Sequence, residues 1–443
     1  MENKLAKVSV AYITLLFLTV NSFMLLKATS FWLITLLIPI YFFIFLFAGI
    51  RIPKTKNFRL LVCFHGAAGL SIFFFTSIFS IIYHIILAFC TIPDNYWDFI
   101  ISFIISYSLL TMLFFNSVVC IYATSVQLGI HLRVLGIIFG FVPIVNLYVL
   151  YYILKTVFKE VEFETAKEEI NEKRRHLKLC ATKYPILLVH GVFFRDQKRL
   201  NYWGRIPNEL FINGARIFYG NHQSALSVAD SAAELTARIK EICQSYGCEK
   251  VNIIAHSKGG LDCRYAIEHL GAGEHIASLT TVSTPHRGCE YADYLLTKLP
   301  EKVKNRIAKT YNTTLKKLGD ENPDLIAAVS DLTASFCTEF DKNTPTPDYI
   351  FTQSVGSLIP KNATIKSPLS FTAFFIKKSD SINDGLVGEN SFRWGERYTL
   401  ITSRKHYGVS HCDMTDLYKK NIDGFDVREF YVELVNDLKE RGF

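Results

Sequence analysis

The sequence predicts two structural classes in one chain: an all-α transmembrane bundle of about five helices, followed by an α/β domain with a mostly parallel sheet. Two observations carry this prediction. Long apolar stretches without charged residues fill the first part of the chain, and short β-branched runs alternate with amphipathic segments from Tyr184 onward. We therefore expect a multi-pass membrane domain at 1–157, a charged helical linker at 158–183 and the α/β domain at 184–443.

Charge is distributed unevenly between these parts. The chain has 443 residues with 48 Lys and Arg against 40 Asp and Glu, and its mean hydropathy of +0.22 excludes a disordered chain. Residues 1–159 carry 10 basic residues and 3 acids, whereas residues 160–443 carry 38 against 37. The basic excess therefore fits loops that flank membrane spans. We expect a bilayer, and no nucleic acid, as a partner.

Five apolar stretches are long enough to cross a membrane, which takes about 20 residues of helix. None of them contains Asp, Glu, Lys or Arg. They run from Val8 to Leu26, Phe31 to Ile50, Ala67 to Cys90, Phe99 to Tyr122 and Val134 to Leu154. A cleavable signal peptide is the alternative for the first stretch, but its apolar part exceeds the usual 7–15 residues of such a segment.

The loops between these stretches predict the orientation of the chain. Arg51, Lys54, Lys56 and Arg59 form the strongest basic cluster, whereas the loop at 91–98 has two Asp and no Lys or Arg. Because basic loops stay on the cytoplasmic side, we expect the N-terminus in the cytosol. Five spans then place the C-terminal domain on the outer face of the cell membrane.

Six apolar runs are the candidate strands of the second part. They are Ile186 to Val189, Ala215 to Tyr219, Val251 to Ala255, Leu279 to Ser283, Tyr349 to Gln353 and Tyr398 to Thr402. A helix between the second and third is expected to open at a capping box, Ser231-Ala-Ala-Glu234. Another, from about Tyr202 to Asn213, ends before Gly214.

The clearest chemical signal is Ala255-His-Ser257-Lys-Gly259, directly after an apolar run. A serine hydroxyl is a weak nucleophile unless it is held exposed beside a base, and a sharp turn from strand to helix does this. Small residues are needed two positions before and after the serine because the backbone crowds that turn. The first position is Ala255 rather than the usual glycine. We predict that Ser257 is a nucleophile.

Acyl transfer also needs two backbone N–H groups that stabilise an oxyanion. One is expected from Lys258, just after the serine. The second should come from the loop after the first strand, where the Val192 amide is the candidate. We interpret His190 as a structural residue of that loop.

The acid and the base should follow in the order serine, carboxylate, histidine. Asp384 lies in an Asp-Gly turn, which favours it over Asp380 as the acid. His411 and His406 are both candidates for the base. Spacing alone does not decide between these two histidines.

Five motifs together resemble the bacterial triacylglycerol lipases of the Pseudomonas and Burkholderia type. They are Lys183-Tyr-Pro-Ile-Leu-Leu-Val-His-Gly191, Tyr202-Trp-Gly-Arg-Ile-Pro207, Val251-Asn-Ile-Ile-Ala-His-Ser-Lys-Gly-Gly-Leu261, Thr284-Pro-His-Arg-Gly288 and Asn383-Asp-Gly-Leu-Val387. The resemblance covers most of 183–443 and none of the membrane part. It implies an α/β-hydrolase fold with Ser257 as nucleophile, Asp384 as acid and His411 as base, because the family's histidine is followed two residues later by an aspartate.

The resemblance also implies two further features. In the family that later aspartate helps to bind a structural calcium ion, so Asp413 is a candidate ligand, although the stretch from Ser357 to Asp380 shows no clear second aspartate. No other cofactor is expected. A helical lid should fall between Tyr291 and Cys337. Leucines that would line an acyl groove there are Leu295, Leu299, Leu315 and Leu318, and ordinary core packing is the alternative.

These observations favour a membrane-anchored serine ester hydrolase that cleaves lipid-like acyl esters through an acyl-enzyme intermediate. A phospholipase or a GPI-deacylase-like enzyme would use the same three residues on another lipid, because the triad does not define the substrate. A catalytically inert membrane scaffold is the alternative from another class. The sequence gives no oligomeric state.

Overall fold

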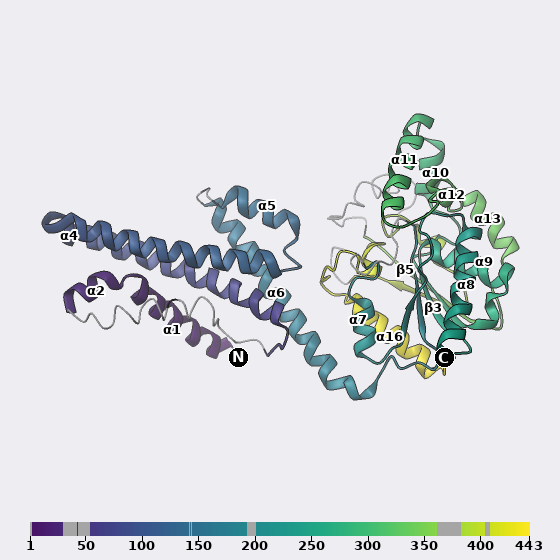
Figure 1. The fold of residues 1–443 in the computed structure, drawn as a ribbon, viewed down its shortest axis with the longest axis horizontal. Helices are drawn as coiled ribbons and strands as arrows, with labels where there is room; N and C mark the ends of the chain where they lie inside the picture. Colours follow the sequence, from purple (N-terminus) through teal and green to yellow (C-terminus); the bar gives the residue numbers. More distant parts are fainter. Residues whose placement is uncertain are drawn as a thin grey trace. The chain divides into compact units, whose positions relative to one another are not determined.

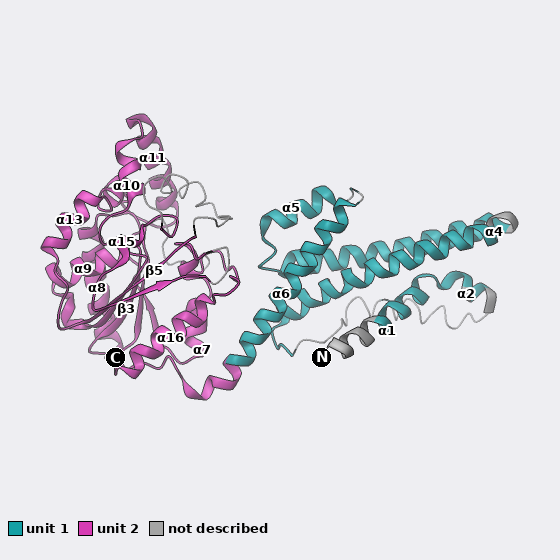
Figure 2. Ribbon diagram, turned by 180° about the vertical axis from the view of Figure 1, so that it is seen from behind, with its two compact units in different colours: residues 1–170 teal, residues 171–443 magenta. Residues whose placement is uncertain are grey.

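The computed structural model describes residues 2–29, 42, 54–140, 142, 144–192, 201–360, 382–403 and 408–443. Figure 2 shows the division of the chain into two compact units, Met1–Ile170 and Asn171–Phe443. The first unit is helical, and the second contains the sheet (Figure 1).

Five helices make up the described part of the first unit. They are α1 (Glu2–Val20), α2 (Ser22–Thr29), α4 (Phe58–Thr124), α5 (Gly129–Phe139) and the first part of α6 (Val145–Arg174). Helix α4 begins at the cap Asn57, whose side chain accepts a hydrogen bond from the Arg59 amide. It is kinked at Asn95, where φ is −153° and ψ is 89°. The kink divides α4 into two long apolar helices.

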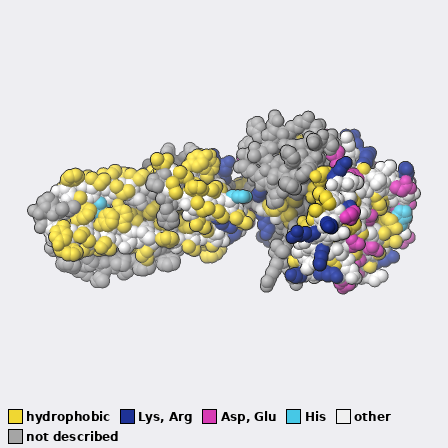
Figure 3. Space-filling view, turned by 90° about the horizontal axis from the view of Figure 1, so that it is seen from above, with side chains coloured by type: hydrophobic (Ala, Val, Ile, Leu, Met, Phe, Trp, Pro, Cys, Tyr) yellow, Lys and Arg dark blue, Asp and Glu magenta, His cyan; other side chains and the backbone are white. Residues whose placement is uncertain are grey.

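Those two helices, Phe58–Thr91 and Asn95–Thr124, are the segments of the described chain that are long and apolar enough to cross a membrane. They match the third and fourth predicted spans. Their surface carries many exposed apolar side chains, including Phe79, Ile85 and Phe89, and Figure 3 shows apolar groups covering much of the helical unit. Composition and length therefore agree with an apolar environment for α4.

The expectation of about five spans is not met in the described residues. The first predicted span divides between α1 and α2, and the apolar helix found in its described part is Val10–Val20. The fifth is interrupted because α5 ends at Phe139 and α6 begins at Val145, where the sequence has Gly140 and Pro143, both unfavourable in a helix. The second, Phe31 to Ile50, lies outside the described residues except for Phe42.

The second unit is built on a six-stranded parallel sheet in the order β2-β1-β3-β4-β5-β6. This confirms the prediction of an α/β domain with a mostly parallel sheet. The strands are β1 (Ile186–Val189), β2 (Ile217–Tyr219), β3 (Val251–His256), β4 (Ile276–Val282), β5 (Phe351–Ser357) and β6 (Arg397–Ile401).

Helices cover both faces of this sheet, which explains why its central strands are continuous apolar runs. Leu188 and Ile254 point to the face covered by α7 (Ile206–Ile212) and α16 (Val427–Glu440). Their neighbours in sequence, such as Ile253, point to the face covered by α8 and α9. These helices run Val228–Tyr246 and Lys258–Leu270, and Figure 1 shows the pairs on opposite sides of the strands.

Helix α8 begins one turn earlier than the sequence predicted. Its cap is Ser227, whose side chain accepts a hydrogen bond from the Asp230 amide. The expected capping box is therefore wrong. Ser231 lies inside the helix, and its hydroxyl accepts a hydrogen bond from Lys258 Nζ instead, at 2.9 Å. Glu234 accepts a hydrogen bond from the Gln223 amide.

Candidate active site

Ser257 occupies the turn between β3 and α9 with a strained backbone. Its φ is 56° and its ψ is −130°, a conformation that few residues other than glycine adopt. Neighbouring groups hold it there: its amide donates to Val282 O at 2.9 Å, and its carbonyl accepts from Thr284 Oγ1 at 2.8 Å. The sheet and the helix together fix the turn, which directs the serine side chain away from both elements.

Crowding around this turn explains the small residues that the sequence places there. A Cβ atom on Gly191 would lie 2.8 Å from Ser257 Cβ. A Cβ on Gly259 would lie 2.5 Å from His190 O. The loop after β1 and the turn after β3 are therefore packed directly against each other.

Asp384 and His411 meet at the carboxyl ends of the strands. His411 Nδ1 lies 2.7 Å from Asp384 Oδ2, and both side chains are buried. Asp384 Oδ1 accepts hydrogen bonds from the amides of Leu386 and Val387, at 3.0 and 2.9 Å. The turn thus holds the carboxylate with one oxygen and presents the other to the imidazole.

His411 also contacts the residue that precedes Ser257. The rings of His256 and His411 lie 4.5 Å apart, and His256 Nε2 is 3.2 Å from His411 O. Because a carbonyl only accepts, His256 Nε2 is the donor, and Nδ1 accepts from the Tyr202 hydroxyl at 2.6 Å. Burial holds the pKa of His256 well below its ordinary value, so the ring is neutral.

The same hydroxyl connects to the loop after β1. The Tyr202 hydroxyl oxygen accepts a hydrogen bond from the Gly191 amide at 3.3 Å. A directed chain of hydrogen bonds therefore runs from Gly191 through Tyr202 and His256 to the backbone of His411. Sequence reasoning assigned no role to Tyr202 or His256, and the only available signal was their presence in the family motifs. None of the hydrogen bonds of the described residues joins Ser257 to His411. In enzymes without bound substrate such a bond is often long, and it tightens only when the substrate binds.

The two residues expected to supply oxyanion donors are neighbours of groups at the turn. Lys258 follows Ser257 as the first residue of α9, and Val192 is the third residue of the loop after β1 and follows Gly191, which crowds Ser257. Both side chains are buried.

The buried Lys258 side chain forms an ion pair with Asp262. Lys258 Nζ lies 2.6 Å from Asp262 Oδ1 and also donates to Ser231 Oγ. The second carboxylate oxygen of Asp262 is 3.8 Å from His222 Nε2. Burial raises the pKa of Asp262 to about 7, against the opposing effect of the Lys258 ammonium.

His222 connects this ion pair to the loop after β1. The rings of His190 and His222 are stacked, with centroids 3.9 Å apart and planes inclined by 6°. His190 Nδ1 lies 2.8 Å from Gly191 O, and Nε2 lies 3.1 Å from His222 O. These contacts agree with a structural role for His190. The buried groups thus connect the loop that carries Val192 to helix α9, which begins at Lys258.

The alternatives from the sequence lie outside the described residues: Asp380 for the acid and His406 for the base. The candidate calcium ligand Asp413 is described, and its Oδ2 accepts hydrogen bonds from the Ser410 amide and hydroxyl at 2.9 and 2.6 Å. Burial raises the pKa of this carboxyl. In the described part of the chain, no three His, Cys, Asp or Glu side chains gather as metal ligands. Most of the stretch in which a second aspartate was sought, 361–381, lies outside the described residues, so calcium at Asp413 stays a prediction.

The expected lid region folds into helices α10 (Glu290–Thr297), α11 (Glu301–Lys317), α12 (Leu325–Ser330) and α13 (Ala334–Asn343). Leu295 and Leu315 are 7% and 2% exposed, as ordinary core residues are. Leu295 and Leu299 belong to a cluster with Val192 and Val387. The helices thus pack against the loops of the candidate site.

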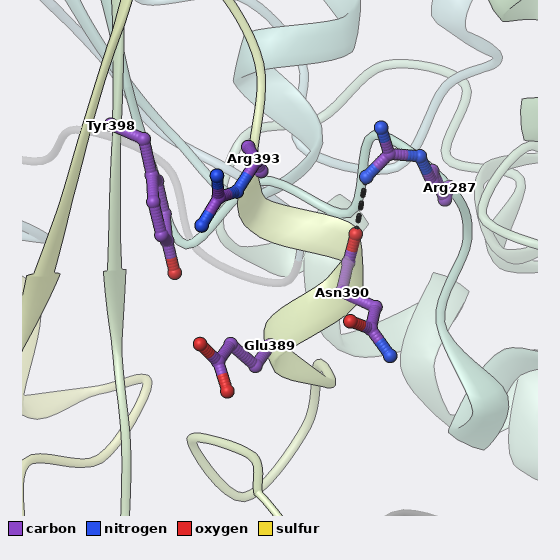
Figure 4. A pocket seen from close by; sticks show the side chains of 5 residues that line it. All are labelled: Arg287, Glu389, Asn390, Arg393 and Tyr398. Atoms are coloured by element: carbon purple, nitrogen blue, oxygen red, sulfur yellow. Dashed lines mark hydrogen bonds between the residues drawn. The ribbon is translucent and has the colours of Figure 1, made fainter.

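A cavity of about 250 Å³ lies beside the turn of Asp384 and is lined by Arg287, Glu389, Asn390, Arg393 and Tyr398 (Figure 4). Arg287 donates to the carbonyl of Asn390, and the Arg393 guanidinium stacks over the Tyr398 ring. Both arginine side chains are engaged at opposite ends of the short helix α15 (Glu389–Phe392). The cavity is therefore polar and separate from the acid and base.

A parallel sheet, a serine in a strained turn from strand to helix, and a carboxylate and histidine later in the chain define an α/β-hydrolase. Comparison with known proteins extends this assignment. Residues 185–322 match the family described as palmitoyl protein thioesterase. The chain is also similar to triacylglycerol lipases.

Two of these lipases show the extent of the similarity. The triacylglycerol lipase of Pseudarthrobacter phenanthrenivorans is 32% identical over 178 residues, which are 38% of this chain and 55% of that protein. The chain thus spans about half the length of this relative. The triacylglycerol lipase of Pseudomonas fragi is 28% identical over 59% of this chain and 98% of its own length. Among solved structures, the mature Bacillus licheniformis lipase BlEst2 is 22% identical with a TM-score of 0.43, covering 57% of this chain and 92% of its own.

Proposed function

We propose that this protein is a membrane-anchored serine hydrolase that cleaves the carboxylic ester bond of lipid-like acyl esters. The observation that carries the proposal is the hydrogen bond between His411 Nδ1 and Asp384 Oδ2, next to the strained turn of Ser257. Similarity to triacylglycerol lipases supports an acyl ester as the substrate. The five motifs further favour an enzyme of the Pseudomonas and Burkholderia type.

The proposed reaction has two halves. Ser257 Oγ attacks the ester carbonyl while His411 Nε2 takes the serine proton, and the Val192 and Lys258 amides donate to the developing oxyanion. The imidazolium, stabilised by Asp384, gives that proton to the departing alcohol, which leaves an acyl-serine. Water then attacks the acyl carbon, loses a proton to His411, and Ser257 leaves with that proton as the free acid is released. No cofactor enters these steps.

The membrane anchor is the second part of the proposal. The two halves of α4 supply helices of spanning length, and the exposed apolar side chains on them favour a lipid environment. We propose a multi-pass arrangement in the cell membrane with the basic loop at 51–59 on the cytosolic side. Because α4 crosses twice, the second unit lies on the outer face only if the segment 134–154 crosses as well. Protease digestion of intact cells tests this orientation, and full protection of the second unit would overturn it.

Hydrolysis of short, medium and long acyl esters by the detergent-solubilised full chain tests the proposed reaction. Ser257→Ala should abolish activity. Ser283→Ala is the matched control because Ser283 follows β4 with a similar positive φ, 51°, and its hydroxyl is also buried near the site. Activity that persists in Ser257→Ala, or is lost equally in Ser283→Ala, contradicts the proposal.

A thioester substrate is a second candidate, favoured by the match to palmitoyl protein thioesterase over 185–322. The same attack by Ser257 would release a thiol in place of an alcohol. A palmitoyl thioester, a phospholipid and a triacylglycerol offered to the same preparation would separate the candidate substrates. Inactivity of wild type on all of them would favour the inert scaffold.

A further inference from the structure

The charge of the second unit is concentrated in one helix. Residues 171–443 carry 37 Lys and Arg against 32 Asp and Glu. Within them, residues 298–317, which contain α11, carry seven basic residues and the single acid Glu301. The remaining residues of the unit carry 30 Lys and Arg against 31 Asp and Glu. The whole basic excess of this unit therefore lies on α11 and the few residues before it.

Most of this charge lies on one face of the helix. Lys302, Arg306, Lys309 and Lys316 follow spacings of four, three and seven residues, which place side chains in one row. All four are exposed, and they form no ion pair with any described residue. We call these four residues the basic face of α11.

The opposite side of α11 is packed onto the domain. Ala308 and Leu315 are 8% and 2% exposed, and Ile307 packs against the cluster that contains Val192 and Val387. The basic face is therefore the outer surface of the helical layer over the loop of Val192. Figure 1 shows α11 projecting from the second unit.

An apolar side chain accompanies the basic face. Val303 lies three residues before Arg306, next to it on the helix surface, and is 42% exposed although it is large and hydrophobic. A helix with Lys and Arg on one side and an exposed apolar group beside them suits the boundary between lipid headgroups and acyl chains. Binding to nucleic acid would also explain the basic charge, but it would not explain why the apolar side chain of Val303 is exposed.

We propose that the basic face of α11 binds the anionic headgroups of a lipid surface and holds the second unit against membranes that contain them. Four unpaired cations complement a negatively charged leaflet, and the apolar helix α4 of the same chain provides a reason for a bilayer to be near. The activity readout of this inference rests on the proposed hydrolase function, whereas the binding readout does not. The rate at which the protein hydrolyses esters in an anionic lipid surface is then higher than the rate in a neutral surface.

Activity of the full chain in mixed micelles tests the effect on hydrolysis. A long-chain ester is dispersed in neutral detergent with or without phosphatidylglycerol. The triple variant Lys302→Glu, Arg306→Glu and Lys309→Glu should lose the stimulation by phosphatidylglycerol, which we expect to be about 10-fold at low salt and to vanish at high salt. Hydrolysis of a soluble short ester should be unchanged.

The matched control replaces three exposed lysines outside α11 with glutamate: Lys178, Lys183 and Lys240. It has the same change in net charge and should keep the stimulation. Equal loss of stimulation in both triple variants, or full stimulation in the α11 variant, overturns the proposal.

Binding is measured separately in a chain that carries Ser257→Ala, so that loss of hydrolysis does not hide it. Thr313→Trp adds a fluorescent reporter within the basic face, because Thr313 is exposed and lies four residues after Lys309 and three before Lys316. Its emission should shift to shorter wavelength when phosphatidylglycerol is added, and the triple variant should abolish the shift. No shift with phosphatidylglycerol, or a shift with RNA instead, contradicts a lipid partner even if the enzyme is active.

Discussion

His411 and Asp384 are joined through both their side chains and their backbones. His411 Nδ1 lies 2.7 Å from Asp384 Oδ2, and the His411 amide donates to the Asp384 carbonyl at 2.8 Å. The backbone bond fixes the two loops in register, so the orientation of the imidazole does not depend on the side chains alone. This arrangement leaves Nε2 of the imidazole as the nitrogen available to a nucleophile.

Asp384→Asn should lower kcat on the order of 10³–10⁴-fold, because an amide does not stabilise the imidazolium and favours the wrong tautomer. Steady-state hydrolysis of a soluble ester measures the change. Asp380→Asn is the control and should retain activity. Equal activity of the two variants would show that the acid is misassigned.

His411→Gln should reduce ester hydrolysis to a level comparable with that of Ser257→Ala, since nucleophile and base act as one unit. His406→Gln should remain active. Both are measured as kcat on the same ester, together with circular dichroism to verify folding. Activity that is retained in His411→Gln and lost in His406→Gln would assign the base to His406.

Tyr202→Phe removes the hydroxyl that connects Gly191 to His256. Two buried groups then lose their partner, which costs about 1–3 kcal/mol of unfolding free energy for each unsatisfied group. Because these groups hold the loop of Val192 and the backbone of His411, we expect kcat to fall with little change in KM. Denaturant unfolding and steady-state kinetics measure the two effects.

A matched control for Tyr202→Phe is Ser278→Ala, which removes a buried hydroxyl bonded to Asn252 near the start of β4. It should lower stability without lowering kcat. If both variants reduce kcat alike, the effect of Tyr202→Phe reflects general loosening of the fold.

The Lys258–Asp262 pair should make stability depend on pH. Burial raises the pKa of Asp262 from its ordinary 3.8 to about 7, so the folded protein keeps a proton there that the unfolded chain loses between these values. The unfolding free energy should therefore fall as pH rises through this window. Asp262→Asn should flatten that slope and, at the upper end of this window where the carboxyl is ionised, cost about 3–5 kcal/mol by leaving Lys258 unpaired.

Denaturant unfolding across this pH window measures both quantities. Lys258→Met combined with Asp262→Leu should recover much of the loss, because apolar groups of similar volume replace the buried charges. Lys342→Met, which removes an exposed ion pair with Glu339, should leave stability unchanged. A slope that persists in Asp262→Asn assigns the titration to another group.

Removal of divalent metal should leave the fold intact. Asp413 already has hydrogen-bond partners in Ser410, whose amide and hydroxyl both donate to Oδ2. We therefore expect EDTA to change neither Tm nor ester hydrolysis. A fall in Tm that added calcium reverses would establish a metal site and contradict this expectation.

Local sequence patterns predicted the parts of the structure that depend on neighbouring residues. The apolar run, the small residues and Ser257 predicted the turn from strand to helix because backbone crowding acts within a few positions. The parallel sheet followed from the alternation of strands and helices. The number of spans was less predictable, because α1, α2 and α5 have apolar composition but end within a span's length.

The sequence by itself determined the two kinds of unit, the strands and the residue types of the candidate triad, since hydrophobic periodicity and turn chemistry are local properties. Only the tertiary structure decided how those residues are supported. Tyr202 and His256 are 54 positions apart, and Lys258 and Ser231 are 27 apart, yet each pair shares a buried hydrogen bond. Such contacts form when packing of the sheet and helices excludes water, and no local pattern specifies which distant polar groups become partners.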